Sequence, residues 1–212
     1  MGKPLHHTDW LLILFFINGL LFLFAKLYHA KKFNVFLSLP FNAGLHEFEK
    51  EFNPYGGKDL FDIALSINSF LIYSTGLYLI FNPDLSLWSD FFRILFILIL
   101  FFLLKNFIGL FVAWLFDKNE EVSYSHNANL AYRIWSSIWV FPLLLFLVFV
   151  PFLKENSSFL AALVLVIAYT LSMTVGVLRL WAMNAYKYYK IFYLCALEIG
   201  PLLILIFWLK NH

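Results

Sequence analysis

The chain has little of what metal, redox and catalytic sites are built from. Its 212 residues include a single cysteine, Cys195, which excludes an intramolecular disulfide and any metal site made of several cysteines. The six histidines all lie outside the long apolar runs and show no ligand spacing on a helix, so no haem, quinol or zinc site is indicated. Glycine-rich phosphate loops, nucleophile elbows and paired carboxylates within a span are also absent. We therefore expect no metal, no cofactor and no enzymatic activity.

Charge is scarce as well. Only 13% of the residues are charged and 62% are hydrophobic, whereas a soluble domain averages about 25% charged and about 45–50% apolar. The net charge of +2 is too small to favour nucleic acid as a partner. A chain of this length cannot hide so much apolar surface in a water-soluble core. Its first partner is therefore the lipid bilayer.

The apolar residues are grouped into runs of membrane-spanning length. A hydrocarbon core of about 30 Å needs roughly 20 mostly apolar residues per helix. We expect an all-α, polytopic membrane protein, with about six helices in one bundle that forms a single domain over 1–212. The predicted spans are 10–28, 60–82, 91–116, 131–153, 158–181 and 187–209.

The longest connection, 29–57, is predicted to be a cytoplasmic loop. Its phenylalanines, starting at Phe33, favour a short interfacial helix whose rings dip into the lipid headgroups. A docking surface for a soluble partner is the alternative.

Orientation follows from lysine and arginine near the span ends. Ten of the fifteen lie in or beside the connections after the first, third and fifth spans, four lie near the opposite ends of the spans, and Lys105 lies in the middle of a span. The side richer in these residues is normally cytoplasmic. We therefore expect the connections after the first, third and fifth spans in the cytoplasm and both termini on the opposite side of the membrane.

Two lone charges stand in the middle of apolar runs. Lys105 interrupts the third predicted span and Glu198 interrupts the sixth. A charge at the centre of a membrane helix costs about 2.5–3.5 kcal/mol on insertion scales and usually faces a partner or a cavity. The two lie at similar depth, so we predict an intramembrane pair; separate satisfaction of each charge is the alternative. Gly200 and Pro201 predict a kink beside Glu198, because proline removes a helical hydrogen bond.

A polar stripe runs along the second predicted span, and further charges lie near the cytoplasmic ends of other spans. The stripe is spaced 4, 3, 4 and 3 and so shares one helix face, which favours helix packing over a substrate path. Its residues are Asp62, Ser66, Ser69, Tyr73 and Gly76. The charges either form a cluster with Asp62 or snorkel separately to the interface. They are Arg133, Arg179 and Lys187.

The sequence Tyr-Leu-Cys-Ala-Leu-Glu-Ile-Gly-Pro at 193–201 resembles the closing motif of a family of uncharacterised inner-membrane proteins from Bacteroidota. Ala196 stands where that motif has threonine. The resemblance implies a bacterial lineage and localisation in the inner membrane, which would place both termini in the periplasm. It adds no catalytic residue.

Three functions are compatible with these features. The leading hypothesis is a non-catalytic subunit or scaffold of a larger envelope complex, such as a secretion, motility or respiratory assembly, in contact with other membrane proteins. The main alternative is a small transporter or proton-coupled device that uses Glu198 and Lys105. The least favoured is a lipid-modifying enzyme with a cytoplasmic-face site made of Asp62, His126, Arg133 and Arg179.

Overall fold

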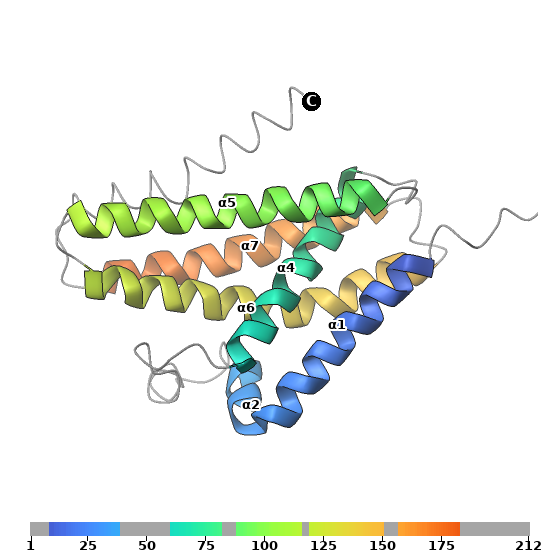
Figure 1. Cartoon of the computed structure of the whole chain (residues 1–212), viewed down its shortest axis with the longest axis horizontal. Helices are drawn as coiled ribbons and strands as arrows, with labels where there is room; N and C mark the ends of the chain where they lie inside the picture. The colour runs from blue at the N-terminus through green and yellow to red at the C-terminus, as the bar shows by residue number, and fades with distance from the viewer. Residues whose placement is uncertain (1–8, 39–59, 82–87, 116–118, 151–156, 183–212) are drawn as a thin grey trace, which may run out of the picture.

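The computed structural model describes residues 9–38, 60–81, 88–115, 119–150 and 157–182, and these residues are almost entirely helical (Figure 1). The helices are α1 (Asp9–Tyr28), α2 (Ala30–Ser38), α4 (Leu60–Phe81), α5 (Trp88–Leu115), α6 (Asn119–Phe149) and α7 (Ser157–Ala182). The described ranges contain no strand. The predicted all-α fold is confirmed.

Four of the helices contain a stretch long and apolar enough to cross a membrane. These stretches are Trp10–Tyr28, Leu60–Phe81, Trp88–Ile108 and Leu130–Phe149. They coincide with four of the six predicted spans. The fifth predicted span is helical within α7, but its apolar part, Ser157–Ser172, is shorter. The sixth, 187–209, lies outside the described residues.

Helix α4 is the centre of the bundle. It packs against α1, α5, α6 and α7, and it crosses the last three obliquely (Figure 1). More than half of its apolar span is buried, 56%, against 6% of the α5 span. The side chains of Ser69, Ser74 and Thr75 are buried on it, and small residues let neighbouring helices approach closely. Composition therefore explains why α4, and not the more apolar α5, lies inside.

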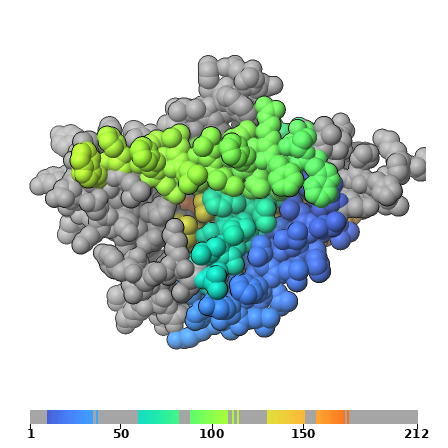
Figure 2. Space-filling model, viewed as in Figure 1, coloured from blue at the N-terminus to red at the C-terminus, as the bar shows by residue number. Residues whose placement is uncertain are grey.

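The outward side of α5 is a surface of large apolar side chains. Helix α5 extends across the upper part of the face shown in Figure 2, above α4 and α1. Phe96, Phe107 and Trp114 are 66%, 68% and 70% exposed. So much apolar surface is typical of contact with lipid or with another membrane protein.

Helix α2 occupies the start of the segment that was expected to be a loop with an interfacial helix. The chain turns at His29, whose amide donates to the Ala25 carbonyl at 3.1 Å. Phe33 is buried in a core cluster with Phe61 and Ile134 rather than exposed to lipid headgroups. The expectation for this phenylalanine was wrong, because α2 packs back against α1 and α6.

Candidate functional site

Arg133 lies at the junction of three helices. Its side chain leaves α6 and passes between two aromatic rings, with its Cζ atom 4.5 Å from the centroid of Phe70 on α4 and 4.3 Å from that of Phe102 on α5. The two rings also meet edge to face, with their centroids 5.3 Å apart. An arginine over an aromatic face is attracted by the ring quadrupole, more strongly when it is removed from water. The pair of rings therefore fixes the guanidinium between α4 and α5.

Hydroxyl groups surround the same junction. The Tyr73 hydroxyl of α4 lies 2.6 Å from the Ser136 hydroxyl of α6. Because Ser136 donates to the Arg133 carbonyl at 2.9 Å, Tyr73 is the donor to Ser136. Ser172 of α7 also approaches the Tyr73 hydroxyl. Tyr73 thus joins three helices beside the cation.

The positive charge of Arg133 has no acidic partner in the part of the chain that the structure describes. Its Nε atom is buried and makes no hydrogen bond there. The ion pair that joins two described side chains is elsewhere, between Lys32 and Asp62. An uncompensated cation in a low-dielectric interior is costly, so it favours an anion at this position.

Lys32 and Asp62 join α2 to α4. The Lys32 Nζ atom is 3.0 Å from Oδ1 and 3.1 Å from Oδ2 of Asp62, and the two side chains are only 12% and 16% exposed. The Lys32 ammonium also lies 5.0 Å from the centroid of the Phe61 ring. Asp62 is therefore engaged with the helix that follows the first span.

The structure separates Asp62 from Arg133, and a cluster of the two was one of the two alternatives that the sequence left open. Arg133 contacts α4 at Phe70, eight residues or about 12 Å along the helix from Asp62. Arg179 lies within α7, and Lys187 lies outside the described residues.

The other residues of the polar stripe on α4 interact within that helix or pack against a neighbouring one. Ser69 donates to the Ser66 carbonyl at 2.8 Å, within its own helix. Gly76 faces α7 so closely that an added Cβ atom would lie 2.9 Å from the Leu165 methyl groups. Of the five stripe residues, Tyr73 is the one that reaches the Arg133 junction. The close approach at Gly76 is typical of helix packing in membranes.

Lys105 is partly buried on α5, one turn after Phe102, and it takes part in an interaction within the chain. Its predicted partner Glu198, and the kink residues Gly200 and Pro201, lie outside the described residues. The pair of Lys105 and Glu198 stays a prediction.

Sequence reasoning missed the aromatic partners of Arg133 and the partner of Asp62. Phe70 and Phe102 are two of 27 phenylalanines, and nothing in their spacing distinguishes them. Lys32 belongs to the connection after the first span, and its proximity to Asp62 depends on the tertiary structure.

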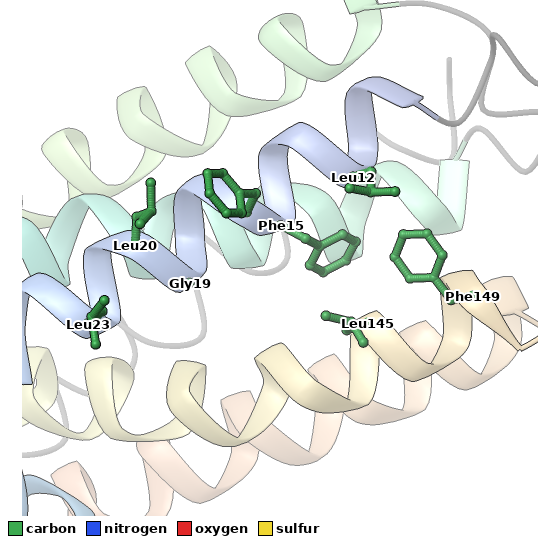
Figure 3. Close-up of a pocket in the computed structure, with 8 residues that line it drawn as sticks. Leu12, Phe15, Gly19, Leu20, Leu23, Leu145 and Phe149 are labelled. Carbon is green, nitrogen blue, oxygen red and sulfur yellow. The ribbon is translucent and has the colours of Figure 1, made fainter.

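A shallow groove, open to the outside, lies between α1 and α6. Its volume is about 360 Å³, and in Figure 3 the side chains of Leu145 and Phe149 point from α6 toward α1. Gly19 forms an open part of it, since an added Cβ atom would meet nothing within 4 Å. The lining is Leu12, Phe15, Phe16, Gly19, Leu20, Leu23, Leu145 and Phe149. Such a lining offers no side-chain hydrogen bond or charge to a polar ligand.

Comparison with known proteins identifies a family. Neither the curated proteins nor the solved structures contain a match to this chain. The family model described as "Domain of unknown function (DUF4271)" matches residues 11–209, which is nearly the whole sequence. The chain therefore belongs to the DUF4271 family.

Proposed function

We propose that the protein is a non-catalytic integral membrane subunit or scaffold of a larger bacterial envelope complex, such as a secretion, motility or respiratory assembly. We further propose that it resides in the inner membrane of a member of the Bacteroidota. One observation carries the proposal. Most of the described polar side chains within the spans hydrogen-bond to their own helix or join neighbouring helices.

Hydroxyl groups illustrate this use. Thr75 donates to the Leu71 carbonyl and Ser137 donates to the Ile134 carbonyl, each within its own helix. Ser158 of α7 donates to the Leu79 carbonyl of α4 at 3.0 Å, between helices. A transporter or an enzyme needs polar groups that converge on a cavity. The α1–α6 groove has an apolar lining instead, which supports a role in assembly.

The outer surface is compatible with the same role. Large apolar side chains are exposed along α1 as well as α5, including Phe16 at 64% and Leu27 at 77%. Helices in a membrane associate through van der Waals packing rather than through a hydrophobic drive, so a surface of this kind can contact either lipid or the helices of a partner.

Purification of the native protein in a mild detergent, with mass spectrometry of what accompanies it, tests the proposal. We expect stoichiometric membrane partners, and no transport or catalysis by the isolated protein in liposomes. A monomer or homodimer that transports or turns over a substrate, with activity lost in Glu198→Gln, would contradict the proposal and favour the proton-coupled alternative.

The proposed orientation places both termini in the periplasm and the segment 29–57 in the cytoplasm. Ten lysine and arginine residues on one side against four on the other motivate it. In a Cys195→Ala background, cysteines introduced at His212 and at Phe48 would be labelled by a membrane-impermeant maleimide. We expect labelling at position 212 in spheroplasts, and at position 48 only after the membrane is opened. Labelling of position 48 in sealed spheroplasts would reverse the topology.

A further inference from the structure

Two phenylalanine rings restrain the Arg133 guanidinium but do not use its hydrogen-bond donors. The Cζ atom lies 4.5 Å from the Phe70 centroid and 4.3 Å from that of Phe102, and the attraction comes from the ring quadrupoles. A guanidinium also presents N–H donors in a planar fork. The Nε–H is buried and makes no hydrogen bond to any residue that the structure describes. The cation is therefore fixed in position and able to bind an anion.

The described carboxylates of the helices that form the junction do not reach Arg133. Asp62 of α4 pairs with Lys32. Asp90 and Glu121 stand at the starts of α5 and α6, each about 18 Å along its helix from the junction. The described part of α7 contains no acidic residue. An anion for this cation therefore has to come from outside these helices.

Arg133 lies close to one boundary of the apolar core. It is three residues, or about 4.5 Å, after Leu130, where the apolar stretch of α6 begins. Phe102 is six residues, or about 9 Å, before Ile108, where that of α5 ends. These two ends lie at the same end of the bundle, and α4 crosses both helices obliquely, so Phe70 can meet them there (Figure 1). Lipid headgroups can reach a cation at this depth, because a bilayer thins locally around an arginine.

The junction is also open to its surroundings. Arg133, Phe70 and Phe102 are each only half-buried. Directly after Phe102, α5 exposes Leu103 and Leu104 by 60% and 54%. A cation thus adjoins an apolar surface, and an amphiphile with an anionic head and acyl chains complements both. The head would meet the guanidinium while the chains lie along α5.

We propose that the junction of α4, α5 and α6 binds an anionic phospholipid, whose phosphate accepts hydrogen bonds from the Arg133 guanidinium. Arginine and phosphate form paired, charge-assisted hydrogen bonds, and basic pockets between membrane helices bind anionic headgroups. A carboxylate on a partner's helix has the same sign of charge, but the position near the boundary and the adjoining apolar surface favour lipid. The bound lipid would join α5, whose span is only 6% buried, to α4 and α6. Such a site would exist whether the protein acts alone or in a complex.

Lipid binding by the purified full-length protein tests this site. The protein is stripped of lipid in detergent, phosphatidylglycerol is added back, and native mass spectrometry measures its affinity. We expect Arg133→Gln to bind phosphatidylglycerol about tenfold more weakly than the wild type, because the variant loses charge-assisted hydrogen bonds. Arg93→Gln is the matched control, since Arg93 is exposed near the opposite end of α5. Its affinity should change by less than about twofold, as for other exposed charges.

Phe102→Leu is a second variant, which keeps the charge of Arg133 but removes one of the rings that restrain it. It should bind phosphatidylglycerol about threefold more weakly. Phosphatidylethanolamine and inorganic phosphate should raise the unfolding temperature of the wild type less than phosphatidylglycerol does.

Unchanged affinity in Arg133→Gln would overturn the proposal and assign Arg133 to another anion, such as a partner's carboxylate. If Arg133→Gln does not fold, unchanged affinity in Phe102→Leu would have the same consequence. An equal loss in Arg93→Gln would show general attraction to positive charge instead of a site. Equal stabilisation by inorganic phosphate would show that the site takes free phosphate rather than a lipid.

Discussion

Replacing Asp62 with leucine is expected to lower the free energy of unfolding by roughly 2–4 kcal/mol, because it removes the carboxylate from a largely buried ion pair with Lys32. This range is slightly lower than the cost of breaking a fully buried pair, because the Lys32 and Asp62 side chains are still 12% and 16% exposed. The loss should appear in thermal or denaturant unfolding of the purified protein in detergent. It should also free α2 from α4 and increase proteolysis near Ser38.

The double variant Lys32→Met/Asp62→Leu is the control for this prediction. Removing both charges leaves neither one stranded, so it should cost much less than the sum of the two single changes. Lys32→Met alone should resemble Asp62→Leu, since it breaks the same ion pair by removing the ammonium. Strictly additive losses would show that the ion pair does not couple α2 to α4.

Replacing Trp10 with alanine is expected to destabilise the protein by about 3–5 kcal/mol, the range for deleting a large buried aromatic side chain. Trp10 is 5% exposed, and its ring centroid lies 5.2 Å from that of Tyr78 on α4 and 5.4 Å and 5.5 Å from those of Trp88 and Phe91 on α5. It therefore links the first helix to two others at one end of the bundle. Chemical unfolding in detergent would measure the loss.

Phe16→Ala is the matched control on the same helix. Phe16 is 64% exposed, so its removal should change the free energy of unfolding by less than about 1 kcal/mol. Trp10→Phe should keep most of the stability, because the indole N–H of Trp10 is buried and makes no hydrogen bond to any described residue. Equal losses in Trp10→Ala and Phe16→Ala would mean that the aromatic cluster does not hold α1.

The sequence by itself determined the helices and the environment they need. Apolar runs of span length, with charged breaks between them, predict helices close to the observed α1, α4 and α5. The reason is local, because the backbone of a membrane helix forms its hydrogen bonds within the same segment whose side chains face lipid. The spacing from Asp62 to Gly76 also predicted one shared face on α4. These features depend on residues that are neighbours in the chain, so they can be predicted from the sequence.

The tertiary structure decided which helix is central and which charges meet. Nothing local to Arg133 shows that its guanidinium lies between Phe70 and Phe102, because the rings come from two other helices. Asp62 binds Lys32, thirty positions earlier, since α2 packs back against α1 and α6 and so brings Lys32 to the start of α4. Almost every side chain in a membrane span is apolar, so hydrophobic pattern cannot select the partners. Close packing and the few polar contacts select them, and those depend on the assembled bundle.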